Sequence, residues 1–132
     1  MTGDDFINLA GKLATSADEA SLRSAVSRAY YGTFHLASAF LEEIERPVPR
    51  NTNAHVVVAR KLQSAGQADA SRAGSLLADL HSDRIKADYR LNDTRATTSA
   101  FARICVETAH EIRSALNACR AEPARSEIKS RL

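Results

Sequence analysis

Apolar residues recur every three or four positions along most of the chain, which is the spacing of helices that bury one face. No segment alternates apolar and polar residues over the length of a strand, and the three valines at 56–58 lie within a segment that also has helical periodicity. The pattern predicts an all-α fold, an up-and-down bundle of four or five helices with one long central helix. The expected helices cover about residues 4–14, 16–44, 54–65, 69–91 and 94–119.

The second helix is the longest and is expected to lie at the centre of the bundle. Its apolar stripe continues for about 27 residues, roughly 40 Å at 1.5 Å per residue. Pro47 and Pro49 end it, because proline cannot continue a helix. The members of the stripe are Leu22, Val26, Ala29, Thr33, Leu36, Phe40 and Ile44.

Helix ends are marked by residues that satisfy free backbone groups. Gly66 is expected to stop the third helix, because glycine adopts the left-handed conformation that ends many helices. A Ser, Thr or Asp side chain can accept a hydrogen bond from the first turn of a helix. The expected N-terminal caps are Thr2 with Asp5, Ser16 with Glu19, Asp69 and Thr94.

A chain of 132 residues with 44% apolar composition is long enough for one hydrophobic core and too short for two. We expect a single domain over residues 1–121. Pro123 opens a charged segment, 122–132, which has too little apolar content to pack firmly and is expected to be a flexible tail.

Cys105 and Cys119 lie fourteen residues apart on one expected helix, roughly 21 Å, which is too far for a disulfide. They are expected to be reduced core residues. The first residues lack the basic start and apolar run of a signal peptide, and no stretch approaches the roughly 20 apolar residues of a membrane span. A cytoplasmic location without membrane contact is therefore expected.

The net charge of +2 is accounted for by residues 120–132, so the body of the chain is neutral overall. Overall charge alone does not indicate nucleic-acid binding, which depends on clustered Lys and Arg. However, residues 21–41 and 46–68 contain no acidic residue, which allows one positive face. Their basic residues are Arg23, Arg28, Arg46, Arg50, Arg60 and Lys61.

A cation and an anion interrupt the apolar stripe of the fourth expected helix. Leu77, His81, Arg84, Asp88 and Leu91 follow one another at four, three, four and three residues, so they share one face. A buried arginine costs several kcal/mol unless it is paired, and Asp88 is one turn away. We expect a partly buried ion pair, which either fixes helix register or belongs to a functional site.

The central helix has a second polar face. Arg28, Tyr31 and His35 fall within about 60° of one another on the side opposite the apolar stripe. Gly32 lies beside them, and a glycine in the middle of a helix costs roughly 1 kcal/mol relative to alanine. Close approach of another backbone, a partner subunit or a ligand would explain it, and so would simple helix packing.

No motif for a metal or a cofactor is present, and none is expected. The four histidines have no metal-ligand spacing, and Glu107 with His110 forms only one of the two pairs that a di-iron bundle needs. The chain has no glycine-rich phosphate loop, nucleophile elbow or Cys-His signature, so the commoner enzyme classes are not indicated.

Several of these residues together resemble the HEPN domain, in particular its small stand-alone prokaryotic members. The resemblance covers about residues 4–120 and implies a helical bundle that is usually a homodimer. Such proteins are often encoded beside a minimal nucleotidyltransferase, in toxin-antitoxin or defence modules. The residues that carry it are Arg28-Ala29-Tyr30-Tyr31 with Phe34 and His35, His55 at the start of the next helix, and Arg84-x-x-Ala87-Asp88-Tyr89.

Many HEPN proteins are metal-independent endoribonucleases with an arginine and, a few residues later, a histidine. Here Arg84 matches the arginine, but residues 89–91 are Tyr, Arg and Leu. Cleavage through the RNA 2′-hydroxyl needs a group that titrates near neutral pH, and tyrosine is a poor substitute. His81, three residues before Arg84, is the nearest candidate for that role. Other HEPN domains are thought to bind nucleotides or RNA, or to act as dimeric interaction modules.

The resemblance and the residues together predict a dimeric HEPN-type protein that binds RNA or a nucleotide, or acts on it. One alternative is a metal-independent ribonuclease in which Arg84 holds the scissile phosphate and His81 assists. Others are a non-catalytic module that partners a nucleotidyltransferase, and a purely structural dimer. The expected binding residues are Arg28, Tyr31, His35, Arg84, Asp88 and Tyr89.

Overall fold

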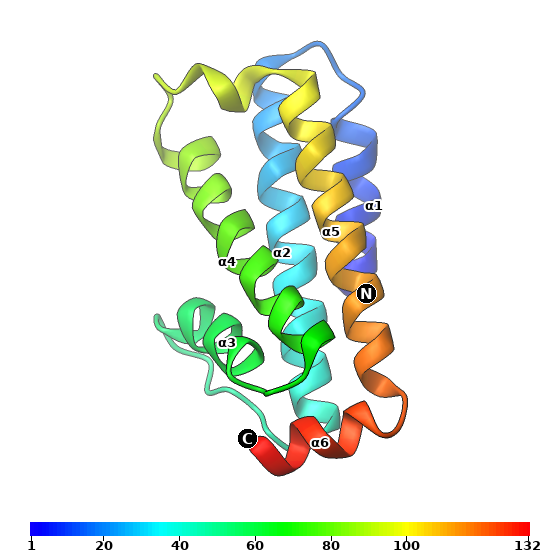
Figure 1. Ribbon diagram of the computed structural model, residues 1–132. Coiled ribbons are helices and arrows are strands. Elements are labelled where there is room, and N and C mark those ends of the chain that lie inside the picture. The colour runs from blue at the N-terminus through cyan, green and yellow to red at the C-terminus, as the bar shows by residue number, and fades with distance from the viewer.

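Helices make up the whole of the regular structure, as the sequence predicted (Figure 1). The computed structural model describes residues 1–132. Its elements are α1 (Gly3–Leu13), α2 (Glu19–Glu43), α3 (Ala54–Gln63), α4 (Ala68–Tyr89), a short 3₁₀ helix η1 (Thr94–Thr97), α5 (Ser99–Arg120) and α6 (Ala124–Arg131). No helix combines the length and the apolar character that a membrane crossing requires.

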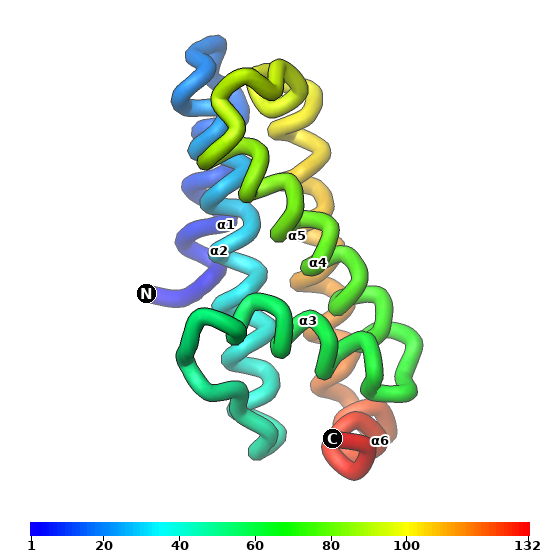
Figure 2. Tube along the Cα trace, turned by 90° about the vertical axis from the view of Figure 1, so that its left-hand side faces the viewer, coloured from blue at the N-terminus to red at the C-terminus, as the bar shows by residue number.

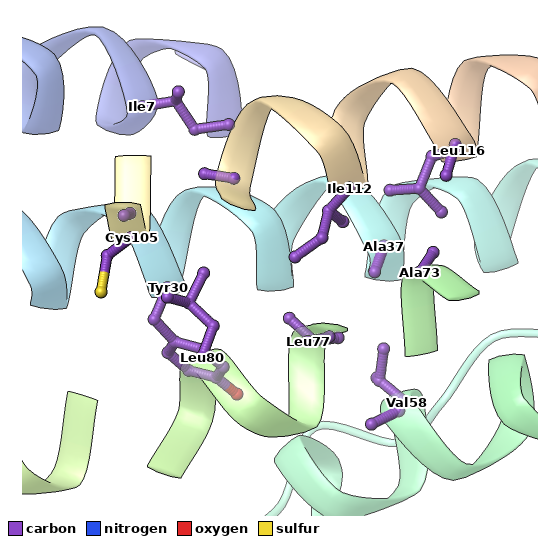
Figure 3. Packing of buried hydrophobic residues seen from close by; sticks show 14 of the residues in the cluster. Ile7, Tyr30, Ala37, Val58, Ala73, Leu77, Leu80, Cys105, Ile112 and Leu116 are labelled. Atoms are coloured by element: carbon purple, nitrogen blue, oxygen red, sulfur yellow. The ribbon is translucent and has the colours of Figure 1, made fainter. Parts of the chain in front are cut away.

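Helix α2 is the central element, and α1, α4 and α5 all pack against it (Figure 1). The shorter α3 packs mainly on α4, so the two lie side by side while the loop before α3 folds back along α2 (Figure 2). The core lies where α1, α2, α4 and α5 meet (Figure 3). Fully buried residues there include Ile7, Tyr30, Leu77, Leu80, Ile112 and Leu116.

The capping box of Thr2 and Asp5 at the start of α1 is confirmed. The other three predicted caps are wrong by two to four residues. The caps are Asp18 for α2, Gln67 for α4 and Thr98 for α5. Near the start of each of these helices several side chains can accept a hydrogen bond from the backbone. The residue that does so is the one whose own backbone is extended.

The C-terminal end of α4 is held by Arg23 of α2, a residue that the sequence analysis did not single out. This residue is only 6% exposed, and its Nε donates to Glu19 at 3.0 Å. The two Nη groups donate to backbone carbonyls at and beyond the end of α4, at 2.8 to 3.3 Å. The carbonyls are those of Lys86, Ala87, Arg90, Leu91 and Asp93. Arg23 therefore satisfies acceptors that a helix end otherwise leaves open.

The segment after α5 is packed, so the expectation of a tail too polar to pack is wrong. Ile128 of α6 is completely buried. Arg125 donates to the Glu43 carbonyl at 3.0 Å, and Lys129 lies 3.5 Å from Glu45. One isoleucine and contacts to the end of α2 therefore seat α6 across the end of the bundle (Figure 1).

Two leucine or isoleucine side chains and two cysteines show how the faces of α1 and α5 are used. The apolar periodicity of these helices suggests that Leu9 and Ile104 belong to the core, but both are exposed because α1 and α5 are covered on one side only. Both cysteines are free and buried, as predicted. Burial raises the pKa of Cys105 to about 12 and that of Cys119 to about 11, so both thiols stay protonated.

Gly32 is explained by the crossing of α1 over α2. A Cβ atom at Gly32 would lie 2.7 Å from the Gly3 carbonyl oxygen and 2.7 Å from Cγ1 of Ile7. Of the explanations that the sequence left open, close approach of a backbone within the same chain is the one observed. Gly32 is buried by α1 and does not offer a surface to a second copy.

We expect Gly32→Ala to destabilise the protein by about 1 to 3 kcal/mol, because the added methyl group overpacks the α1–α2 crossing. Gly11→Ala is the matched control: no atom lies within 4 Å of its added Cβ. The control should stabilise α1 by up to about 1 kcal/mol through helix propensity alone. Urea unfolding measures both. Equal effects of the two substitutions would show that the crossing is not closely packed.

Candidate functional site

Six side chains from three helices gather on one side of α2 in what we call the aromatic–arginine cluster. Helix α2 contributes three rings, α3 contributes one histidine, and α4 contributes a histidine and an arginine. The histidines and the arginine all lie within 6.1 Å of one of the α2 rings. The cluster consists of Tyr30, Tyr31, Phe34, His55, His81 and Arg84.

A short hydrogen bond joins Tyr30 to His55, with 2.6 Å between Oη and Nδ1. Burial raises the pKa of the Tyr30 hydroxyl, so this group keeps its proton. Burial also lowers the pKa of His55, and the charge of Arg84 lowers it further, so the imidazole is neutral at pH 7. The hydroxyl has no other partner, which makes it the donor and His55 Nδ1 the acceptor. The ring proton of His55 is then on Nε2.

His81 lies parallel to His55, with ring centroids 5.3 Å apart and planes inclined by 3°. Burial is the first cause that lowers the pKa of His81, and the neighbouring His55 and Arg84 add to it. Both imidazoles are therefore neutral near pH 7. His81 is free to accept a proton, whereas Nδ1 of His55 already accepts the Tyr30 hydroxyl. Two stacked neutral histidines beside an arginine are a group that can transfer protons near a bound anion.

Arg84 is 7% exposed and lies among tyrosine rings. Its Cζ is 5.2 Å from the centroid of Tyr31, 5.6 Å from that of Tyr30 and 5.7 Å from that of Tyr89. Its Nη1 is 3.5 Å from Oδ2 of Asp88, so the predicted partly buried pair is present. Nε of Arg84 is buried and has no hydrogen-bond partner. The guanidinium therefore keeps unused donor capacity.

Asp88 is held from two sides, because Ser27 of α2 donates to the same Oδ2 atom at 3.1 Å. Its side chain is 28% exposed, and Tyr89 beside it is 72% exposed. The Asp88–Tyr89 edge is thus where Arg84 comes closest to solvent. A ligand that approaches from this edge meets a tyrosine face first and the arginine behind it.

The remaining predicted site residues lie beside the cluster. Arg28 places its Cζ 5.5 Å from the centroid of Tyr31 and 5.2 Å from that of Phe6 in α1. His35 is exposed, and its ring centroid is 5.7 Å from those of Phe6 and Phe34. Helix α2 therefore brings Arg28, Tyr31 and His35 to one side of the bundle, next to Arg84.

The sequence did not indicate that Tyr30 and His55 interact with each other in this site. Tyr30 lies next to the apolar stripe of α2, where a buried aromatic is ordinarily a core residue. His55 was noticed only as the histidine that opens α3, and its pairing with Tyr30 depends on how α3 packs. The chain brings no three His, Cys, Asp or Glu side chains together in a group that could hold a metal ion.

We expect Asp88→Ala to destabilise the protein by about 2 to 4 kcal/mol, because it strands a buried guanidinium. Replacing both partners, Arg84→Leu with Asp88→Leu, should cost less than the single change because no charge is left unpaired. Glu111→Ala is the control, since Arg72 and Glu111 form a pair at 3.0 Å whose side chains are 63% and 51% exposed. It should cost about 0 to 1 kcal/mol. Urea unfolding that gives Asp88→Ala no larger an effect than Glu111→Ala would contradict the burial of the pair.

The two histidines should make stability depend on pH. Their pKa values are lowered in the folded state, so the unfolded chain binds more protons below about pH 6.5. This contribution to stability is complete above about pH 6.5. It is lost as the pH falls through the pKa values that the two histidines have in the folded state. We expect the melting temperature to drop from pH 7.5 to 5.5, and to drop less when both histidines are phenylalanine. His110→Phe, at an exposed position of α5, should behave like the unchanged protein.

Comparison with known proteins adds no identification. No family model matches the chain, and neither a curated protein nor a solved structure does. The aromatic–arginine cluster, with an incompletely paired arginine and two neutral histidines, therefore carries the functional proposal.

Proposed function

We propose that this chain is a HEPN-type helical protein that binds RNA or a nucleotide at the aromatic–arginine cluster. The single observation that carries the proposal is Arg84, whose buried Nε lacks a partner while tyrosine rings surround its guanidinium. A buried donor without a partner costs free energy that a bound acceptor would recover. A phosphate oxygen is such an acceptor, and arginine binds phosphate through paired N–H donors.

The rings beside Arg84 suit the other part of a nucleotide. Tyr89 is exposed and Tyr31 is partly exposed, so both can offer a face to a base. Stacking of a base on an aromatic side chain contributes about 1 to 3 kcal/mol and tolerates any base. Arg28, beside Tyr31, adds a second cation near the same edge. Phosphate and base recognition are therefore supported by neighbouring side chains.

The resemblance to HEPN proteins supplies the wider setting of the proposal. It implies a homodimer in a toxin-antitoxin or defence module, with a minimal nucleotidyltransferase as the partner. A cytoplasmic location fits such a module. These features stay predictions for this chain, because they depend on the resemblance and not on the cluster.

A second candidate, a metal-independent endoribonuclease, is favoured by the stacked His55 and His81. In such a reaction the RNA 2′-oxygen attacks the adjacent phosphorus and its proton passes to a neutral imidazole. The P–O5′ bond breaks, and the 5′-oxygen takes up the proton from the imidazolium just formed. Arg84 would hold the phosphate, and His81 could accept the proton. His55 is the weaker candidate, because its Nδ1 already accepts the hydrogen bond from the Tyr30 hydroxyl.

The two candidates separate in one experiment in EDTA, with a fluorescent single-stranded RNA as probe. We expect binding without appreciable cleavage, and a loss of about tenfold or more in affinity for Arg84→Ala. Arg84→Lys keeps the charge without the planar fork and should recover binding only in part. Arg103→Ala, at an exposed position of α5, controls for loss of one positive charge. Fluorescence anisotropy measures binding, and gel electrophoresis measures cleavage.

Cleavage in EDTA that is lost in Arg84→Ala would overturn the preference for binding and establish a ribonuclease. Loss in His55→Asn or in His81→Asn would then name the proton acceptor. If the protein neither binds nor cleaves RNA, the cluster serves helix packing or protein docking. Circular dichroism of each variant, before the assay, shows that it is folded.

A further inference from the structure

A cavity of about 280 Å³ opens between α2, the loop before α3 and the first turns of α3. It lies next to the aromatic–arginine cluster, with which it shares Phe34 and His55. No residue in the loop part of its wall was a candidate in the sequence. The side chains on which the argument depends are Phe34, Ser38, Arg50, Asn51, His55 and Val58.

The cavity combines flat apolar walls with unused hydrogen-bonding groups. The Phe34 and His55 rings lie 4.5 Å apart at one side, and Val58 provides apolar surface. The Ser38 hydroxyl makes no hydrogen bond within the chain. Asn51 accepts a hydrogen bond from Asn53 N–H through Oδ1 at 2.9 Å, which leaves its amide NH₂ free. An aromatic wall with a few free donors and acceptors is what a heteroaromatic ring binds.

The volume limits the ligand to a small one. Pockets for drug-sized ligands measure about 300 to 1,000 Å³, and this cavity is slightly smaller than that. A nucleobase, with part of its sugar, is of suitable size. A larger flat molecule would not be enclosed.

The surroundings of the cavity favour a ligand with negative charge. Arg50 is 93% exposed at its mouth, and its only ion-pair partner is Glu42 at 3.9 Å. Arg60 and Lys61 of α3 form no ion pair within the chain. The neighbouring Glu43 and Glu45 are engaged by Arg120 and Lys129. Glu42 is the one acidic residue in the cavity wall, whereas the segment 46–68, which supplies the loop and α3, carries four basic residues and no acidic one.

His55 connects the cavity to the cluster, because it lines the one and is a member of the other. A ligand that contacts the exposed side of His55 also lies in the field of Arg84, whose charge lowers the pKa of this imidazole. His55 is therefore a residue through which the cavity adjoins the cluster.

We propose that this cavity is a nucleobase subsite, which takes one base of a phosphate-bearing nucleotide between Phe34 and the loop before α3. The inference rests on the proposed function and extends it, because it names a second place of contact. The same ligand chemistry is found in a free nucleoside monophosphate and in single-stranded RNA. Ser38 and Asn51 contact the base edge, and Arg50 attracts the phosphate.

The test fills the cavity and removes the charge at its mouth. Ser38→Leu places an apolar side chain in the base site, and Arg50→Ala removes an exposed cation without disturbing the core. The controls are Ala39→Leu, at the next position of α2 and outside this cavity, and Arg103→Ala. The probes are AMP and UMP by calorimetry and a single-stranded RNA heptamer by fluorescence anisotropy.

We expect Ser38→Leu to lower the affinity for both kinds of probe by about tenfold or more, because the stacking of one base is lost. Arg50→Ala should weaken binding several-fold and reduce its salt dependence, while both controls stay within about twofold of the unchanged protein. If only the heptamer binds, RNA is the source of the base. If the monophosphates also bind, a free nucleotide is enough.

Failure of the inference differs from failure of the proposed function. RNA binding that needs Arg84 but is unchanged by both Ser38→Leu and Arg50→Ala would overturn the nucleobase subsite alone. Monophosphate binding that needs Ser38 and Arg50 but not Arg84 would support the subsite and contradict the proposed site at Arg84. Absence of binding by every probe would overturn both.

Discussion

The burial of two arginines between α2 and α4 is the constraint on which the rest of the structure depends. Arg23 and Arg84 are 6% and 7% exposed, and a buried guanidinium without partners costs several kcal/mol. Arg23 of α2 finds its partners at the end of α4, and Arg84 of α4 lies against the tyrosines of α2. If α4 slid along α2, Arg23 would lose its carbonyl acceptors and Arg84 would lose its contacts with the tyrosine rings.

The two arginines differ in how fully they are satisfied, and the difference separates a structural role from a candidate functional one. Arg23 donates to five carbonyls and one carboxylate. Arg84 has one carboxylate at 3.5 Å and a buried Nε without a partner. Natural proteins satisfy nearly all buried polar groups, and departures concentrate at sites of function. Arg84 is such a departure, and it lies where aromatic rings and neutral histidines meet.

The electrostatics of the site follow from the same burial. The loss of water on burial lowers the pKa of His55 and His81, and the positive charge of Arg84 adds to this, so both rings are neutral at pH 7. Neutral rings can stack closely, as these do, whereas two imidazolium groups would repel one another. Burial thus keeps both histidines neutral, and Arg84 adds to the effect; one of them, His55, also lines the neighbouring cavity.

The sequence by itself determined the features that depend on near neighbours in the chain. Helix existence and the pairing of Arg84 with Asp88 are fixed by spacings of three and four residues, which any helix brings together. Helix caps were less predictable, because several side chains near each start compete for the same backbone groups.

Contacts between helices were decided only by the tertiary structure. Arg23 reaches carbonyls more than sixty residues away, and His55 meets Tyr30 only because α3 packs on α4 beside α2. Spacing along one helix shows which of its residues share a face. Which other helix packs on that face depends on how the apolar stripes of all the helices are buried together.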